Sequence, residues 1–218
     1  MRLLQKTERI SGVGIHSGQV TTLQIFPAKE KGIWFSKHLP ATSTRASYSN
    51  VSNTKFQTNL GDFATVEHLM AALWSNNVNN VVCCIDGEKS SEVPIMDGSA
   101  LPFIELLEKS KLIAQNNSVE FLVIKNPVHV TGDYGSFSRL EPLQSRNAYF
   151  EVDIKVDFFG LIERFIYTHN WLSFESQKSF KQEIAPARTF VFEREVDHLK
   201  KTWPWSRRQF HQLLYIFK

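Results

Sequence analysis

The sequence has few cysteines, no long apolar run and little charge bias, and each of these absences excludes a class of protein. Its two cysteines, Cys83 and Cys84, are adjacent, and neighbouring residues rarely meet disulfide geometry, so no disulfide framework is available. We interpret both as buried strand thiols in a reducing cytoplasm. No run of about 18 apolar residues occurs, which excludes a transmembrane helix. The formal net charge of +3 is too small to indicate nucleic-acid binding.

The first residues do not have the pattern of an export signal. Charges at Arg2, Lys6 and Glu8 stand where a signal peptide needs an apolar core, so we expect a cytoplasmic protein. The composition, with 42% hydrophobic and 22% charged residues, is ordinary for a globular chain. A length of 218 residues suffices for one large domain or two small ones.

The stretch 65–74 has the clearest helical pattern in the chain. Its apolar residues recur at i, i+3, i+4 and i+7, and they are Val66, Leu69, Met70 and Leu73. Thr65 is the predicted N-cap, which places Glu67 and His68 in the first turn. A carboxylate beside an imidazole at a helix start can hold a general base and a metal ligand next to one substrate. The alternative is an exposed glutamate beside an ordinary histidine.

The remaining pattern predicts an α+β fold. Strands are predicted at 21–26, 33–35, 81–85, 119–124, 128–130 and 149–158, with 164–172 pairing with the last. Helices are predicted at 100–112, at 175–184 and from 193 to 201. The alternation of elements starts again after the polar stretch 115–118, which is the predicted linker between two domains.

Four motifs occur in one order along the chain. They are Gly-Val-Gly-Ile-His-Ser-Gly at 12–18, Thr-Val-Glu-His-Leu-Met-Ala-Ala-Leu at 65–73, Glu-Val-Pro-Ile-Met-Asp-Gly-Ser-Ala at 92–100 and Ala-Arg-Thr-Phe at 187–190. Together they resemble the zinc-dependent UDP-3-O-acyl-N-acetylglucosamine deacetylases of lipid A biosynthesis. The resemblance implies two successive α/β sandwich domains, at 1–116 and 117–201, the second incomplete. Residues 202–218 form a tail without family resemblance.

The resemblance also implies a chemistry. A zinc ion, Zn2+, polarises the substrate's acetamide carbonyl while a carboxylate takes a proton from the attacking water. Glu67 matches the family's general base and His68 its first zinc ligand. Thr189 matches a threonine that can hydrogen-bond the tetrahedral oxyanion. Acetate would be removed from UDP-3-O-acyl-N-acetylglucosamine, the committed step of lipid A biosynthesis.

Three further residues match positions near the substrate in this family. Phe190 matches a wall of the acyl-chain passage, while Phe56 and Gln57 align more loosely. The expected partner is the UDP-linked acylated glucosamine and not nucleic acid, and peripheral contact with the inner membrane stays open. We interpret Asp97 as a structural turn residue, and His16 as a structural residue or one that supports the site.

The sequence also departs from the family pattern. The family's other two zinc ligands, a His and an Asp four residues apart, and its general-acid His all lie well beyond residue 201, and no matching residues occur. Neither His198 nor His211 stands where the family has a ligand. A hydrolytic zinc needs three protein ligands, so the alternative function is a non-catalytic truncated product of the same family.

The tail from residue 202 has an unusual composition. Read one base further on, the codons for residues 203–210 can spell Gly-Leu-Gly-x-Gly-Gly followed by Asn or Ser, which resembles a family loop. We therefore hypothesise a frameshift near residue 202. The competing interpretation is a functional tail, because its Lys and Arg residues interleave with Trp, Phe and Tyr as in a membrane-surface or nucleic-acid segment.

Overall fold

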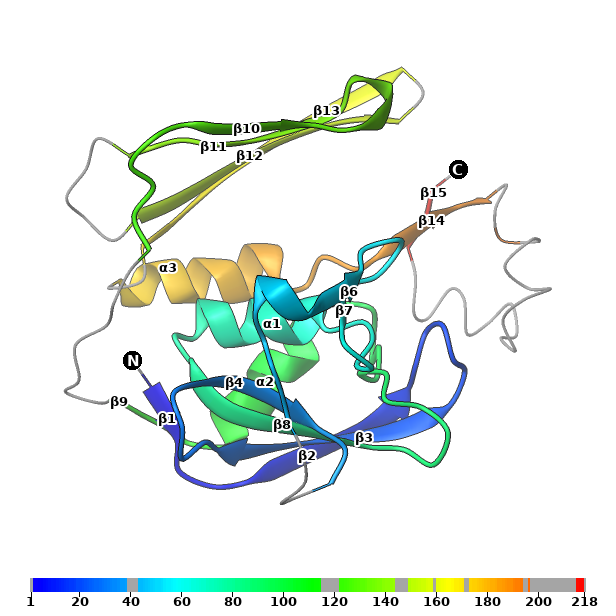
Figure 1. Cartoon of the computed structure of the whole chain (residues 1–218), viewed down its shortest axis with the longest axis vertical. Helices are drawn as coiled ribbons and strands as arrows, with labels where there is room; N and C mark the ends of the chain where they lie inside the picture. Colours follow the sequence, from blue (N-terminus) through cyan, green and yellow to red (C-terminus); the bar gives the residue numbers. More distant parts are fainter. Residues whose placement is uncertain are drawn as a thin grey trace. The chain divides into compact units, whose positions relative to one another are not determined.

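The computed structural model describes residues 2–38, 43–114, 122–143, 149–158, 160–170, 173–193, 196 and 215–217. The chain forms two compact units, residues 1–116 with 180–218, and residues 117–179 (Figure 1). One division falls at residue 116 and the other before Phe180, so the segment that begins at Phe180 packs with the first unit. The family domains at 1–116 and 117–201 and the tail at 202–218 stay predictions.

The first unit is built on a five-stranded sheet in the order β2-β3-β8-β4-β5. Its strands are β2 (Glu8–Val13), β3 (Val20–Pro27), β4 (Gly32–Ser36), β5 (Thr44–Arg45) and β8 (Asn80–Asp86). Neighbours are antiparallel except β4 and β8, which run parallel. In β3 every second residue is buried, among them Leu23 and Ile25, as expected for a strand with one face on a core. Cys83 and Cys84 are buried free thiols on β8.

The described part of this unit also contains three two-stranded sheets. Strand β1 (Arg2–Leu4) pairs with β9 (Leu112–Ala114), and β6 (Val51–Asn53) pairs with β7 (Asn59–Leu60), both antiparallel. Strand β14 (Phe190–Phe192) pairs in parallel with β15 (Tyr215–Phe217). A 3-10 turn, η1 (Tyr48–Asn50), precedes β6.

Helices α1 (Glu67–Ser75) and α2 (Leu101–Lys109) pack on each other over one face of the five-stranded sheet (Figure 1). Leu69 and Leu73 of α1 and Phe103 and Leu107 of α2 belong to the core, and all four side chains are fully buried. Burying each such side chain contributes about 1.5–3 kcal/mol. Pro102 lies in the first turn of α2, as predicted, where a missing amide costs little.

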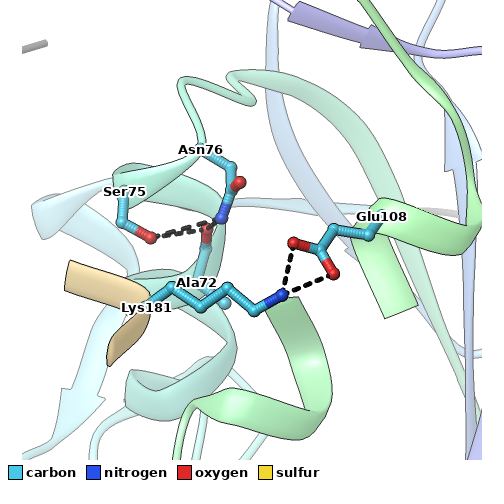
Figure 2. Close-up of polar contacts among 5 residues, drawn as sticks. All are labelled: Ala72, Ser75, Asn76, Glu108 and Lys181. Atoms are coloured by element: carbon cyan, nitrogen blue, oxygen red, sulfur yellow. Dashed lines mark hydrogen bonds and ion pairs between the residues drawn. The ribbon is translucent and has the colours of Figure 1, made fainter. Parts of the chain in front are cut away.

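Phe180 and Lys181 contact the helices of the first unit through a ring contact and an ion pair. The Phe180 ring lies edge-on to Trp74 of α1, with centroids 6.0 Å apart. Lys181 donates to both carboxylate oxygens of Glu108 on α2, at 2.7 and 2.8 Å (Figure 2). These contacts bring Phe180 and Lys181 to α1, which carries the second motif, and to α2, which follows the third.

Hydrogen bonds from outside the regular helical pattern satisfy backbone groups at the end of α1 and at the start of α2. At the end of α1, Ser75 Oγ and Asn76 Nδ2 both donate to the carbonyl of Ala72 (Figure 2). At the start of α2, the backbone amides of residues 100 and 101 donate to the carbonyl of Ala185, at 3.0 and 3.1 Å. Helix termini leave such groups without intrahelical partners, so Ala185 helps to fix where α2 begins.

In its described residues, the second unit contains two hairpins and a short helix. Strand β10 (Val128–Thr131) pairs with β11 (Phe137–Leu140) around the turn η2 (Asp133–Gly135), and β12 (Tyr149–Phe158) pairs with β13 (Leu161–Asn170). Helix α3 (Phe174–Ser179) packs on β13 and continues into the π-helical turn η3 (Phe180–Ile184) of the first unit. Across the second hairpin, Arg164 donates to both carboxylate oxygens of Asp153.

Large apolar side chains of the second unit are exposed. The most exposed of those on its strands are Val130 at 60%, Phe137 at 68%, and Ile162 and Ile166 at 55% each. Of the side chains in this unit whose burial is described, His169 alone is fully buried. The unit therefore has very little core of its own.

The α+β class is confirmed, and several element boundaries need correction. Thr65 is not the N-cap of α1, because the helix begins at Glu67 with Val66 in the cap position and Thr65 in the left-handed region at φ 57°. Helix α2 ends at Lys109 rather than Leu112, because Lys111 has a φ of 53° and the chain turns there into β9.

Some predicted elements fall wholly or partly outside the described residues. Of the strand predicted at 119–124, residues 122–124 form no strand, and the rest lies outside the described part. The linker at 115–118, most of the helix predicted at 193–201, and residues 202–214 also lie outside it. No helix in the described part of the chain has the length and apolar character needed to cross a membrane.

Candidate active site

Glu67 opens helix α1 and is held by a backbone amide from another part of the chain. Its Oε2 accepts a hydrogen bond of 2.9 Å from the amide of Thr58. The side chain is half-buried, and as the first residue of the helix it lies at the end where the helix dipole favours negative charge. The carboxylate is therefore oriented and still partly open to a reactant.

His68 follows in the same turn and is also half-buried. Burial lowers the pKa of its imidazole below the ordinary value of 6.5, against the charges of Glu67 and Asp97, which raise it. Lowering this pKa favours the neutral imidazole near neutral pH, and the neutral form is the one that can bind a metal ion. The direction of this shift agrees with the predicted role of His68 as a metal ligand.

Asp97 is an exposed turn residue, and its Oδ1 accepts hydrogen bonds from the amide and the hydroxyl of Ser99, at 3.0 and 2.8 Å. This geometry agrees with the interpretation of Asp97 as a structural turn residue. Its charge nevertheless acts on His68, so the turn of the third motif lies close to the start of α1.

Thr189 and Phe190 are joined to this turn through the backbone. The amide of Thr189 donates to the carbonyl of Gly98 at 2.8 Å, and the Thr189 side chain is half-buried. Phe190 is 44% exposed and its ring lies edge-on to Phe192, with centroids 5.8 Å apart. The fourth motif therefore lies against the third, although 91 residues separate Gly98 from Thr189 in the sequence.

The two loosely aligned residues differ in their surroundings. Gln57 is half-buried, and its side-chain amide lies 3.0 Å from the hydroxyl of Thr65. Phe56 is 86% exposed, with Lys55 Nζ 5.9 Å from the centre of its ring. The structure thus brings Gln57 to the start of α1 and leaves Phe56 at the surface.

Sequence reasoning gave no role to Glu92, the first residue of the third motif, which is 2% exposed and contacts residues of the first two motifs. Its carboxylate accepts hydrogen bonds from the amides of His16 and Ser17 and from the hydroxyl of Thr65. Charged residues are seldom fully buried unless their groups are paired, so the available signal was a glutamate at the head of the apolar stretch Val93–Ile95.

The described residues do not provide a complete zinc site. They contain no group of three or more His, Cys, Asp or Glu side chains that could hold a metal ion. A hydrolytic zinc uses three protein ligands and one open position. His68 can supply one of the three, so the donor set of the described part of the chain does not fit this metal by itself.

Comparison with known proteins agrees with the motifs. The model of the family UDP-3-O-acyl N-acetylglycosamine deacetylase matches residues 2–209. The deacetylase of Citrifermentans bemidjiense is 37% identical over 198 residues, which cover 87% of this chain and 61% of that protein. The corresponding protein of Nitratiruptor is 32% identical over 204 residues, covering 91% of this chain and 65% of its own length.

The chain belongs to the UDP-3-O-acyl N-acetylglycosamine deacetylase family. It spans about 61–65% of the length of the curated relatives it matches.

Proposed function

We propose that the chain takes part in the hydrolytic deacetylation of UDP-3-O-acyl-N-acetylglucosamine. The observation that carries this proposal is the first turn of α1, where the Glu67 carboxylate is fixed by the Thr58 amide beside the half-buried imidazole of His68. Family membership supplies the substrate class, and the printed name of the relatives states their reaction.

The residues of this chain have separate roles in that reaction. Glu67 takes a proton from the water that attacks the acetamide carbonyl. The Thr189 hydroxyl donates to the oxygen on which negative charge develops. Phe190 forms a wall of the passage for the acyl chain, and Phe56 and Gln57 contact the substrate. Breaking the amide bond leaves acetate and a free amine on the sugar.

Zinc enters the proposal only through His68. One imidazole cannot hold a metal tightly, because catalytic sites rely on several fixed ligands. This observation favours the second candidate function, a non-catalytic member of the family that keeps Glu67 and His68 but binds zinc weakly.

One experiment separates the two candidates. The purified 218-residue chain is incubated with UDP-3-O-acyl-N-acetylglucosamine, with and without added zinc, and the released amine is measured; bound zinc is quantified after dialysis. Product formation that disappears in Glu67→Gln but persists in Glu105→Gln supports the deacetylase. Glu105 is a matched control because it is an exposed glutamate on α2. A folded chain without turnover and without retained zinc supports the non-catalytic candidate.

A further inference from the structure

Glu92 is a buried carboxylate that takes no part in the reaction proposed above. Its Oε1 accepts from the amide of His16 at 2.9 Å and from the hydroxyl of Thr65 at 2.9 Å, and its Oε2 accepts from the amide of Ser17 at 2.8 Å. Hydrogen bonds to an ionised group are the strong ones. The carboxylate thus joins the loop of the first motif to the residue two positions before Glu67.

The backbone around Glu92 is held as firmly as its side chain. The Thr21 hydroxyl on β3 donates to the Glu92 carbonyl at 2.8 Å, and the Val93 amide donates to the carbonyl of Ala64 at 3.0 Å. Ala64 and Glu92 form an isolated parallel bridge. Because β3 belongs to the five-stranded sheet, these contacts join the backbone of Glu92 to that sheet.

The loop of the first motif approaches Glu92 closely. A Cβ on Gly14 would lie 2.2 Å from Glu92 Oε2, a distance that side-chain carbons do not tolerate. Glycine at this position therefore allows the amides of His16 and Ser17 to reach the carboxylate.

Thr65 has one hydroxyl hydrogen and two oxygens within reach, Glu92 Oε1 at 2.9 Å and Gln57 Oε1 at 3.0 Å. An ionised carboxylate only accepts, so the hydroxyl donates to Glu92. The two ends of a side-chain amide are interchangeable in assignment, and turning Gln57 lets its NH2 group donate to Thr65 Oγ1. The result is a chain of hydrogen bonds from Gln57 through Thr65 to Glu92.

This chain of hydrogen bonds closes on the general base. Gln57 is followed by Thr58, whose amide donates to Glu67 Oε2 at 2.9 Å and whose carbonyl accepts from the amide of Val66 at 3.1 Å. Residues 57–58 and 65–67 therefore hold one another through three contacts, and Glu92 joins them to the sheet.

We propose that Glu92 is a positioning residue, which fixes the left-handed backbone at Thr65 and thereby sets where the Glu67 carboxylate points. The inference rests on the proposed function for its kinetic consequence, but its structural consequence can be measured in an inactive chain as well.

The test compares Glu92→Gln and Thr65→Val with the wild-type chain. Thr65→Val removes the hydroxyl donor. Glu92→Gln replaces one accepting oxygen by an NH2 group, so at least one of the three donors that contact Glu92 then faces another donor. The Thr58 amide is therefore expected to exchange with solvent at least about tenfold faster, because the loss of a hydrogen bond to a charged group changes a local equilibrium by at least that factor. If the chain turns over substrate, kcat falls by a similar factor while KM is unchanged. Thr65→Ser, which keeps the hydroxyl, restores slow exchange of the Thr58 amide.

Ser110→Ala is the matched control, because it removes a buried hydroxyl that donates to the Leu106 carbonyl at 2.9 Å on α2, away from Glu67. It is expected to leave Thr58 exchange and turnover unchanged. Unchanged Thr58 exchange in a folded Glu92→Gln or Thr65→Val chain overturns the proposal. If the wild-type chain does not turn over substrate, this result counts against the proposed function and not against the role of Glu92. If Glu92→Gln does not fold, Thr65→Val provides the test.

Discussion

The amide of Thr58, in the loop just before β7, donates a hydrogen bond of 2.9 Å to the carboxylate of Glu67, the first residue of α1. The contact leaves one carboxylate oxygen for another partner, and it fixes the plane of the group at the start of α1. In the proposed function, this other oxygen is the one that accepts the proton of the attacking water.

Replacing Glu67 by Gln is expected to abolish proton removal while leaving the fold intact. General acid–base groups contribute about 10²–10⁴-fold to rate, so turnover of the deacetylase substrate should fall by that factor. The measurement is kcat at saturating substrate, with thermal unfolding as the check on folding. A Glu67→Gln chain with wild-type kcat would remove Glu67 from the mechanism.

His68 is expected to account for the zinc affinity contributed by the described residues. His68→Gln should weaken zinc binding at least about tenfold, because the loss of one ligand from a site removes a large share of its binding energy. Calorimetric zinc titration measures this change. The exposed His38 offers a matched control, and equal losses in His38→Gln and His68→Gln would show that zinc binds nonspecifically.

The buried His169 predicts a pH dependence in the second unit. Burial lowers the pKa of His169 in the folded chain below the ordinary value of 6.5, which applies to the unfolded chain. At any pH between these two pKa values, the unfolded chain therefore binds more protons than the folded one. Stability contributed by this group is therefore complete above about pH 6.5 and is lost as the pH falls through the folded-state value. Hydrogen exchange of the β13 amides, compared at pH 7 and pH 5, should show weaker protection at pH 5.

The His169→Gln variant supplies the control for this pH effect, because it removes the titrating group. Its β13 amides should show a smaller difference between the two pH values than those of the wild-type chain. An identical pH dependence in both proteins would assign the effect to other groups.

Two neighbouring residues of the segment after α3 should differ strongly in their effect on stability. Phe180 is 5% exposed, and truncating a buried phenylalanine to alanine costs about 3–5 kcal/mol. The ion pair between Lys181 and Glu108 is partly exposed, and such pairs contribute about 0–1 kcal/mol. Chemical denaturation should therefore give a much lower free energy of unfolding for Phe180→Ala than for Lys181→Met. The reverse order would mean that the ion pair holds the segment.

Local patterns along the chain were sufficient to predict much of the fold. The alternation at 149–158 matches β12 over its full length, and the helical spacing at 65–74 corresponds to α1. The predicted start of α1 was wrong because the Thr65 hydroxyl does not cap the helix amides. It hydrogen-bonds instead to Glu92 and Gln57, which are 27 and 8 residues away. Contacts of this kind leave no periodic signal.

The sequence predicted the proximity of candidate site residues only where those residues lie within a single motif. Glu67 and His68 are adjacent in the sequence, so their proximity needed no tertiary information. Glu92 was missed because its partners, His16 and Ser17, lie 76 and 75 residues away. The contact between Thr189 and Gly98 is equally remote, and only the shared family motifs suggested that the two belong together.

The exposed strands of the second unit have a thermodynamic consequence. The heat-capacity change of unfolding and the denaturant m-value both grow with the apolar surface that becomes newly exposed. Val130, Phe137, Ile162 and Ile166 are already more than half exposed in the folded chain. A calorimeter should therefore record the melting of the first unit almost alone, while the second unit loses its structure gradually and with little heat.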